Sequence, residues 1–313
     1  MTKQPIIVVL GPTASGKTAL AVELAKLYSG EVVSADSMQI YKGMDILTAK
    51  PTVSEMQGIK HHLIDFLEPE TDFSVADYVR LANNAIDDIV SRGKLPVLAG
   101  GTGLYINSLI DNIRFDETTG DKDFREKLFN IAKEKGNHFL WKKLFEVDEA
   151  SASSIHENNV PRVIRALEVY EKTGKKLSEH KKSSRLEESR FDPVMIGLTF
   201  SDRQLLYDRI NKRVDIMISD GLIYEAEEIY KNRNLNTAHQ AIGYKELIPY
   251  FSGQASLEDC IERIKQETRR YAKRQLTWFR RDERIFWMEV DKFKNIVEIL
   301  ENIKKYIAKC INM

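Results

Sequence analysis

The stretch that most constrains this chain runs from Gly11 to Thr18, reads GPTASGKT and fits the pattern G-x-x-x-x-G-K-[ST]. The apolar residues from Ile6 to Leu10 precede it and predict a short buried strand. A helical apolar pattern from Ala19 to Leu27 follows it. A glycine-rich turn between a strand and a helix is the setting in which this pattern binds phosphate groups. We therefore predict a polyphosphate site here.

The residue types within this turn, called the phosphate loop below, explain the prediction. Glycines at positions 11 and 16 have no Cβ, so the chain can wrap tightly around an anion. Lys17 supplies a positive charge to the phosphates, and the Thr18 hydroxyl can ligate Mg²⁺. The predicted diphosphate-binding residues in the loop are Gly11, Pro12, Thr13, Ala14, Ser15, Gly16, Lys17 and Thr18. The motif does not identify the polyphosphate or the bond that breaks.

Length and composition narrow the class of protein. The chain has 313 residues, of which 42% are apolar, enough for a substantial core. Its formal net charge is zero, so any nucleic-acid surface must be local. Cys260 and Cys310 are too few for a disulfide framework or a zinc cluster. The N-terminus leads straight into the first strand with no signal peptide or long apolar run, so we expect a cytoplasmic protein.

Two further strand ends carry polar candidates. Glu31–Ala35 reads as a strand that ends at Asp36, and Lys94–Ala99 as one that ends in GGTGLY. Ligands of open α/β sheets bind outside the carboxyl ends of the strands. Asp36 and Thr102 are therefore candidate site residues, although each can equally cap the turn or helix that follows it.

The sequence lacks a clear acidic residue at the end of the Lys94–Ala99 strand to hold Mg²⁺, and this bears on the function. A phosphate-loop hydrolase usually has an acidic residue at the end of a buried strand to hold Mg²⁺. The strand that ends at Ala99 is followed by glycines, and Asp65 is only a weak substitute. This favours a loop that binds a diphosphate-bearing substrate over one that hydrolyses a nucleotide.

The strand–helix alternation stops in the middle of the chain. Residues 113–192 read as a helical, charged insertion whose last part, Lys172–Arg190, looks like a basic loop. Residues 1–112 and 193–313 form the predicted core, with a strand at Pro193–Phe200. The predicted fold class is α/β, a P-loop NTPase-like parallel sheet flanked by helices, with an all-helical insertion domain.

Arginines and lysines gather after the insertion. Arg209 and Arg213 lie one turn apart on a helix, where they can hold a diphosphate or serve as surface charge. The helix predicted over Leu257–Arg281 is densely basic and carries Tyr271, Trp278 and Phe279. Basic residues contact phosphates and aromatic rings stack on unpaired bases, so this helix predicts contact with nucleic acid.

Together these motifs resemble one family, the tRNA dimethylallyltransferases of bacteria. The resemblance runs along nearly the whole chain and rests on GPTASGKT, DSMQIYKGMDI, TAKP, GGTGLY, RVIRALEVY, RINKRVDIM, IGYKE and TRRYAKRQLTWFRR. The first motif is generic, whereas DSMQIYKGMDI, GGTGLY and the last one are far more specific. Leu47 is a departure, because the family usually has glycine before TAKP.

The resemblance implies a reaction. Dimethylallyl diphosphate would donate its five-carbon group to N6 of adenosine 37 in tRNAs that read codons beginning with U, and diphosphate would leave. Mg²⁺ is the implied cofactor, with Thr18 as its ligand from the chain. The implied partners are the tRNA anticodon arm and dimethylallyl diphosphate. We expect no membrane, no obligate protein partner and a monomer.

The resemblance also implies the site residues. The catalytic set is Asp36 as the base for the exocyclic amine, Thr102 near the breaking bond, and Lys17 and Arg213 on the leaving diphosphate, with Arg209 as a weaker diphosphate ligand. The residues expected to contact tRNA are Asp36, Ser37, Met38, Gln39, Thr102, Asn159, Val160, Pro161, Arg162, Val163, Gln240, Arg269, Lys273, Arg274 and Gln275.

Alternative functions remain open at this point. A phosphate-loop kinase for a small metabolite explains the phosphate loop but leaves the basic helix without a role. A transferase that prenylates free AMP or ADP resembles the core but has less need of an RNA-binding surface. A non-catalytic RNA-binding nucleotide switch explains the basic helix but not Asp36 and Thr102 at neighbouring strand ends.

Overall fold

The computed structural model describes residues 3–113, 121–183, 188–232 and 235–310. The chain forms two compact units: a core of residues 1–110 and 189–313, and an insertion of residues 111–188. The predicted limit of the insertion at residue 192 falls inside a strand of the core, because that strand begins at Phe191, before Pro193.

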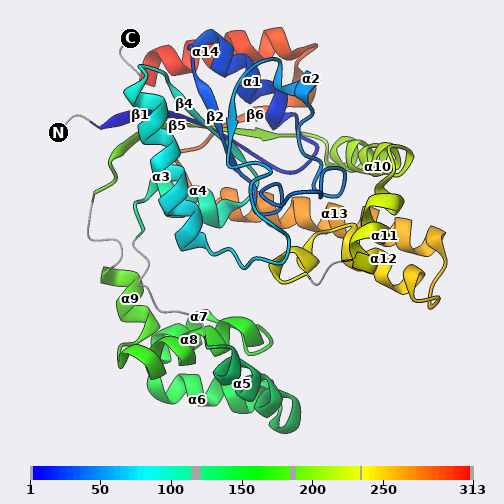
Figure 1. The fold of residues 1–313 in the computed structure, drawn as a ribbon. Coiled ribbons are helices and arrows are strands. Elements are labelled where there is room, and N and C mark those ends of the chain that lie inside the picture. The colour runs from blue at the N-terminus through cyan, green and yellow to red at the C-terminus, as the bar shows by residue number, and fades with distance from the viewer. Residues whose placement is uncertain (1–2, 114–120, 184–187, 233–234, 311–313) are drawn as a thin grey trace. The chain divides into compact units, whose positions relative to one another are not determined.

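A six-stranded parallel sheet forms the centre of the core unit, in the order β3–β2–β4–β1–β5–β6 (Figure 1). The strands are β1 (Gln4–Leu10), β2 (Glu31–Ala35), β3 (His61–His62), β4 (Pro96–Gly100), β5 (Phe191–Thr199) and β6 (Phe286–Glu289). β2, β4 and β1 are neighbours, so the phosphate loop, Asp36 and the GGTG turn all follow strand ends at one edge. The predicted α/β fold class is therefore confirmed.

Alternation along β1 explains the two layers of helices. Ile6, Val8 and Leu10 face one apolar cluster with α3 (Val75–Ser91) and α4 (Gly103–Ile110). Ile7 and Val9 face the other cluster, with α1 (Lys17–Leu27) and α14 (Ile296–Cys310). Because both faces are buried, these strands are apolar throughout.

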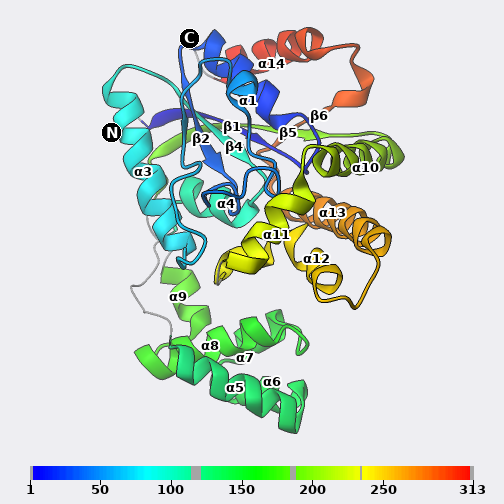
Figure 2. The ribbon, with the colours of Figure 1, turned by 45° about the vertical axis from the view of Figure 1, so that its right-hand side comes forward.

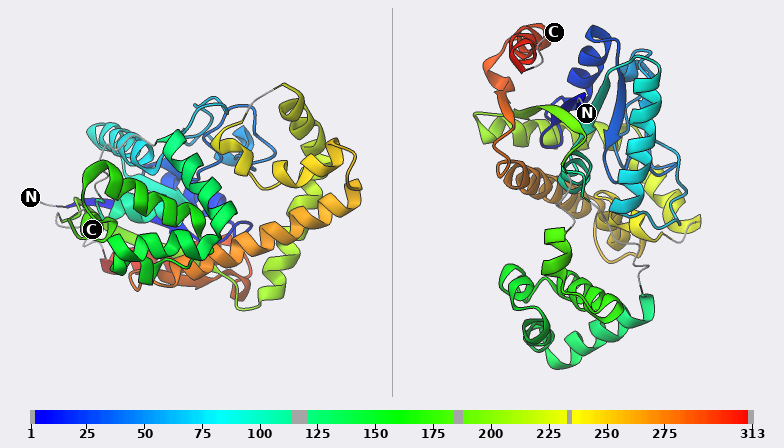
Figure 3. Two further views of the ribbon diagram at one scale, coloured as in Figure 1. Left: turned by 90° about the horizontal axis from the view of Figure 1, so that it is seen from below. Right: turned by 90° about the vertical axis from the view of Figure 1, so that its left-hand side faces the viewer.

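A third apolar cluster lies among the helices that follow β5. These helices are α10 (Arg203–Ser219), α11 (Leu222–Asn232), η1 (Thr237–Gln240), α12 (Tyr244–Phe251) and α13 (Leu257–Phe279). In Figures 1 and 2 they gather at one end of the sheet. Figure 3 shows α13 as a long helix, and its residues take part in two clusters: Ile264 packs in this one, and Phe279 packs beneath the sheet.

The insertion unit has its own small core. It consists of α5 (Lys122–Lys135), α6 (Asn137–Val147), α7 (Glu149–Ser154), α8 (Val160–Thr173) and α9 (Leu177–Ser183). Leu128, Leu140, Leu144 and Ile164 are among its buried residues. The sequence predicted most of these helices. The prediction of a loop over Lys172–Arg190 was wrong at α9, because this short helix is too charged to show an apolar period.

Several short elements escaped sequence reasoning. α2 (Val53–Met56) is a single capped turn, β6 is a four-residue edge strand, and η2 (Val290–Lys292) is a 3₁₀ turn. Elements this short carry too few residues to show a period. Within the described part of the chain, no helix is both long and apolar enough to cross a membrane.

Candidate active site

The phosphate loop is tightly wound where β1 meets α1. Gly11 has φ 146°, and a Cβ there would lie 2.5 Å from the backbone oxygen of Leu198, so only glycine fits. Gly16 has φ 92° and is the N-cap of α1, which begins at Lys17. The free N–H groups of the helix start are therefore available to an anion held in the loop.

Lys17 lies within this loop and is half-buried. Its Nζ donates a hydrogen bond to the backbone oxygen of Pro12 at 2.7 Å. Burial lowers its pKa to about 7, with a further lowering from the nearby Arg213 guanidinium and an opposing rise from Asp36. An anion beside this ammonium would offset both the burial and the repulsion from Arg213, so the group is suited to bind one.

The phosphate loop opens into a cavity of about 370 Å³. Its charged and polar wall carries groups suited to phosphate, to Mg²⁺ and to proton transfer: Lys17, Thr18, Asp36 and Arg213. Its apolar wall is suited to hydrocarbon: Leu47, Ile210, Val214, Met217 and Ile264. The cavity can therefore take a ligand that is anionic in one part and apolar in another.

Asp36 both caps a turn and faces the cavity. Its Oδ1 accepts hydrogen bonds from the backbone N–H groups of Met38 at 2.9 Å and Gln39 at 3.3 Å. Its Oδ2 has no hydrogen-bond partner among the described residues. Asp36 can thus cap the turn and act as a site residue at the same time, because Oδ1 fixes the carboxylate while Oδ2 can accept a proton.

Thr102 lies beside Asp36 but contacts the neighbouring serine. Its Oγ1 accepts from the Ser37 backbone N–H at 3.1 Å and donates to Ser37 Oγ at 3.3 Å. Its own N–H donates to the backbone oxygen of Ala35 at 3.1 Å. The structure therefore shows Thr102 fixing the end of β2, and its contact with a substrate stays a prediction.

The two arginines on α10 differ in burial. Arg213 lines the cavity and donates to the backbone oxygen of Ala49 at 3.3 Å. Burial lowers its pKa from the ordinary value, opposed by the attraction of Glu55 and Asp36. Arg209 is exposed and donates to Ala14 in the phosphate loop at 3.1 Å. Arg213, which is half-buried and lines the cavity, is thus the better placed of the two for a ligand there.

Gln275 on α13 has protein partners where RNA contact was predicted. Its Oε1 accepts from the Thr13 N–H at 2.9 Å, and its Nε2 donates to the Gly101 oxygen at 3.0 Å. A Cβ on Gly101 would lie 2.1 Å from this Nε2, so glycine admits the amide. The side chain is buried, bridges the two glycine-rich turns and lines the cavity, so its contact with tRNA stays a prediction.

Other predicted tRNA-contacting residues divide between the cavity and the surface. Ser37, Met38, Gln39, Gln240 and Arg274 line the cavity. Lys273 is exposed, whereas Arg269 donates to Asn211 Oδ1 at 2.5 Å. The structure thus brings one set of these residues to the same space as Asp36.

The predicted contacts in the insertion lie at the start of α8. Asn159, Pro161 and Arg162 are exposed and Val160 is half-buried. Val163 is buried in the core of the insertion, which corrects its prediction as an RNA contact because its side chain is not at the surface.

A buried carboxylate fixes this same helix. Glu168 accepts from Arg125 at 2.8 Å and from Arg165 at 2.7 Å. Burial alone would raise its pKa, but these hydrogen bonds and one from the Asp121 N–H lower it to about 2. Arg165 therefore has a structural partner on its own helix.

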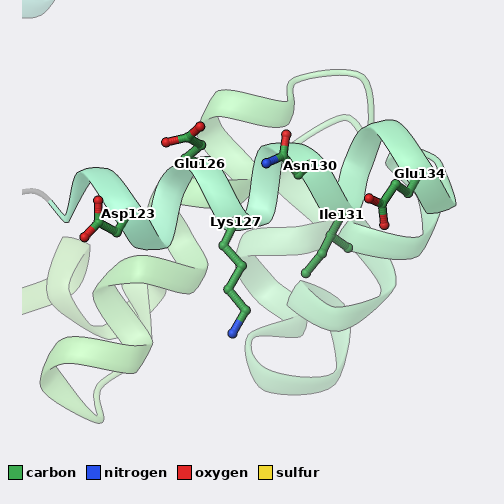
Figure 4. A pocket seen from close by; sticks show the side chains of 6 residues that line it. All are labelled: Asp123, Glu126, Lys127, Asn130, Ile131 and Glu134. Carbon is green, nitrogen blue, oxygen red and sulfur yellow. The ribbon is translucent and has the colours of Figure 1, made fainter.

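A second hollow lies along α5 in the insertion (Figure 4). Its lining comes from this one helix: Asp123, Glu126, Lys127, Asn130, Ile131 and Glu134. Figure 4 shows Lys127 and Ile131 on the opposite side of the helix from Glu126, so the side chains do not converge. We assign no chemistry to it.

Metal ligands are sparse in the residues that the structure describes, where no group of three His, Cys, Asp or Glu side chains could hold an ion. His61 and His62 on β3 instead bond to the Ile59 oxygen and to Glu31. Asp65 is paired with Lys50 at 2.5 Å. Thr18, which lines the cavity, thus remains the candidate metal ligand. In such a site, oxygens of the substrate and water would complete the coordination shell of Mg²⁺.

Sequence reasoning missed the apolar wall of the cavity. On this helix only Arg209 and Arg213 were predicted as site residues, and Leu47 was noted only as a departure from a motif. The available signal was that Arg213 directly precedes Val214 on the helix, since an arginine among apolar residues is typical of a ligand site.

The fold and this cavity define a protein of the P-loop type whose phosphate loop shares a cavity with the Asp36 carboxylate and with apolar side chains. The model of the IPP transferase family matches residues 39–282. The chain belongs to that family.

Named relatives agree over nearly the full length. A tRNA dimethylallyltransferase of Thermoanaerobacter sp. (strain X514) is 52% identical over 311 residues, 98% of each chain. The tRNA dimethylallyltransferase of Bacillus subtilis (strain 168) is 50% identical over 290 residues, 92% of each.

Solved structures extend the similarity to the fold. A tRNA isopentenylpyrophosphate transferase of Bacillus halodurans has a TM-score of 0.74 at 44% identity, covering 98% of this chain and 97% of that one. A eukaryotic dimethylallyltransferase described as acting on tRNA has a TM-score of 0.75 at 34% identity, covering 88% of this chain and 70% of that one.

Proposed function

We propose that the protein transfers the dimethylallyl group of dimethylallyl diphosphate to N6 of adenosine 37 in tRNAs that read codons beginning with U. The products are N6-dimethylallyladenosine and diphosphate. Prenyl transfer to tRNA is supported by relatives named tRNA dimethylallyltransferase that are 52% and 50% identical to this chain. The atom, the nucleotide and the donor are parts of the proposal.

One observation carries it: phosphate-binding cations and a carboxylate with a free oxygen face the same cavity. Lys17, Thr18 and Arg213 lie on its polar wall with Asp36. An apolar wall adjoins them, as a five-carbon alkyl group requires. A kinase needs no such wall, and β4 ends at Gly100 without the acidic residue that phosphoryl transfer usually uses.

The leaving group is stabilised by the phosphate loop. As the bond from C1 to oxygen breaks, its electron pair and the negative charge move onto diphosphate. The loop N–H groups, Lys17 and Arg213 are placed to stabilise that charge. Burial strengthens each of these interactions, since little water remains to screen them.

The nucleophile is a weak one and needs a base. The lone pair of the adenine amine is delocalised into the ring, so a bond from N6 to C1 requires removal of an N6 proton. Oδ2 of Asp36 accepts that proton while Oδ1 stays bonded to the Met38 and Gln39 N–H groups. Thr102 fixes the adjoining Ser37 and keeps the carboxylate in place.

Mg²⁺ fits the polar wall of the cavity. The Thr18 hydroxyl would hold it, and the ion would neutralise part of the diphosphate charge when bound.

The adenine must leave its stack to reach the base, which costs a few kcal/mol. Contacts of Lys273, Arg274 and the start of α8 with the anticodon arm offset that cost.

The test is a transfer assay with purified protein, Mg²⁺, labelled dimethylallyl diphosphate and an unmodified anticodon stem–loop that has adenosine at position 37. A stem–loop with guanosine at that position and free AMP are the matched controls. We expect label in the adenosine stem–loop and none in either control. Transfer to AMP alone would establish an adenylate prenyltransferase, and phosphate transfer from ATP to a small metabolite would establish a kinase.

A further inference from the structure

The segment Asp45–Lys50 is a closed turn in the wall of the cavity. Ala49 N–H donates to the Ile46 oxygen and Lys50 N–H to the Asp45 oxygen, both at 2.9 Å. Like the first turn of a helix, such a turn leaves its leading N–H groups without partners inside the turn. Leu47, Thr48 and Ala49 all line the cavity, so the position of this turn shapes the site.

One carboxylate from a distant part of the chain satisfies those N–H groups. Glu225 on α11 accepts from Asp45 and Ile46 at 3.0 Å through Oε2, and from Leu47 at 2.8 Å through Oε1. Three charge-assisted hydrogen bonds to one side chain fix the turn firmly. Glu225 itself does not line the cavity, so it acts from behind the wall.

The far end of the turn holds two site residues. The Ala49 oxygen accepts from Gln39 Nε2 at 3.1 Å and from an Arg213 guanidinium nitrogen at 3.3 Å. Ala49 has φ 48°, in the left-handed region that is unfavourable for a residue other than glycine. Its carbonyl therefore keeps this direction only while the turn is held.

We propose that Glu225 is a positioning residue for the diphosphate site: it holds the Asp45–Ala49 turn so that the Ala49 carbonyl orients Arg213. This inference rests on the proposed function. It predicts that loss of the carboxylate weakens the binding of the diphosphate end of the donor more than the contact with RNA, to which the turn is linked among the described residues only through hydrogen bonds with Gln39.

Glu225→Gln tests it, because the amide keeps the size of the side chain but presents N–H groups to backbone donors. The matched control is Glu228→Gln, an exposed carboxylate on the same helix that bonds to Asn232. Calorimetry measures the affinity for inorganic diphosphate with Mg²⁺, and steady-state assays measure KM for dimethylallyl diphosphate and for the stem–loop.

We expect Glu225→Gln to weaken diphosphate binding about tenfold, the effect typical of losing one charge-assisted hydrogen bond. KM for dimethylallyl diphosphate rises in parallel and by a larger factor than KM for RNA, and Glu225→Asp restores part of the affinity. A fall in Tm with normal diphosphate affinity would overturn the inference and leave Glu225 a purely structural residue.

The two proposals fail in different ways. If the natural protein transfers nothing to RNA, the proposed function is wrong, while the diphosphate affinities still decide the role of Glu225. If Glu225→Gln does not fold, Glu225→Asp is measured in its place, and wild-type affinity in that variant counts against the inference.

Discussion

The two ends of β2 carry buried charge in opposite ways. At its start, Glu31 is buried and accepts from Arg92 at 2.5 Å, Lys94 at 2.7 Å and His62 at 2.7 Å. The hydrogen bond from Arg92, more than the opposing effect of burial, holds the pKa of this carboxyl well below its usual range. Here the carboxylate is paired directly with cations, and Arg92 has a second acidic partner in Asp88 at 2.7 Å.

At the other end of β2 the charges do not balance. Lys17 and Arg213 are half-buried and repel each other. Asp36 attracts both and Glu55 also attracts Arg213, but no ion pair joins either cation to an acidic group among the described residues. Burial lowers the pKa of Lys17 to about 7. We infer that the paired charges around Glu31 serve the fold, whereas the unpaired cations near Asp36 serve to bind an anionic ligand. The two ends of one strand thus show how structural and functional charges differ.

The largest expected effect is at the functional end. Asp36→Ala removes the base and should lower turnover about a hundredfold to ten-thousandfold. Stem–loop binding, measured by fluorescence anisotropy, should persist because the basic surfaces are intact. Near-normal turnover in this variant would show that another group accepts the proton.

Glu31→Gln should affect stability and leave transfer unchanged. We expect it to cost about 2–3 kcal/mol, because cations lose their buried partner but Arg92 and Lys94 are partly exposed. The surface variant Glu23→Gln, which breaks only an exposed pair with Lys26, should cost less than about 1 kcal/mol. Urea unfolding measures both free energies. Equal costs would show that Glu31 stabilises the fold no more than an exposed ion pair does.

The pH dependence of the free energy of unfolding tests whether Glu31 stabilises the fold as a charged carboxylate. Its pKa is lowered in the folded protein, so the contribution is complete above the ordinary glutamate pKa of about 4.3 and is lost as pH falls below it. The natural protein should therefore lose more stability than Glu31→Gln as pH falls from about 4.5 to about 2.5, as followed by thermal unfolding. Parallel curves would contradict a charged, paired Glu31.

Lys17 should take up a proton when diphosphate binds above neutral pH. Its pKa near 7 rises when the anion supplies the missing negative charge, so uptake at pH 8 approaches one proton and at pH 6 is small. Calorimetry in buffers of different ionisation heat measures this. The control is Lys17→Arg, whose side chain stays charged, so its proton uptake reports the protons taken up by diphosphate itself. Identical uptake in both proteins would mean that Lys17 is already charged before diphosphate binds.

The smallest effect is expected at the exposed basic surface of α13. Replacing Lys273 and Arg274 by glutamine should weaken stem–loop binding and reduce the salt slope of log K by about one per lost phosphate contact. Diphosphate affinity should change little if Arg274 acts on RNA. An unchanged salt slope would exclude this surface as a phosphate contact.

The sequence predicted the sheet and phosphate loop well because local patterns determine them. Apolar β-branched runs define β1 and β2, and the glycines of the loop are required by backbone geometry at Gly11 and Gly16. Asp36 could be placed at the ligand edge because it directly follows β2.

Contacts between distant segments were beyond sequence reasoning. Gln275 contacts Thr13 across 262 positions, and Glu225 contacts Leu47 across 178. Neither side chain differs in type from a surface glutamine or glutamate, so only the fold shows that one bridges two turns and the other holds the cavity wall. Val163 was misassigned for a similar reason, since only the packing of α8 reveals its buried side.

The most direct test of the account concerns the leaving group. Diphosphate released during the reaction should match prenylated stem–loop one to one, as measured by ³¹P NMR and mass spectrometry of the same sample with no ATP present. Added diphosphate should compete with dimethylallyl diphosphate. Orthophosphate release, or transfer that requires ATP hydrolysis, would contradict a phosphate loop that holds a departing diphosphate.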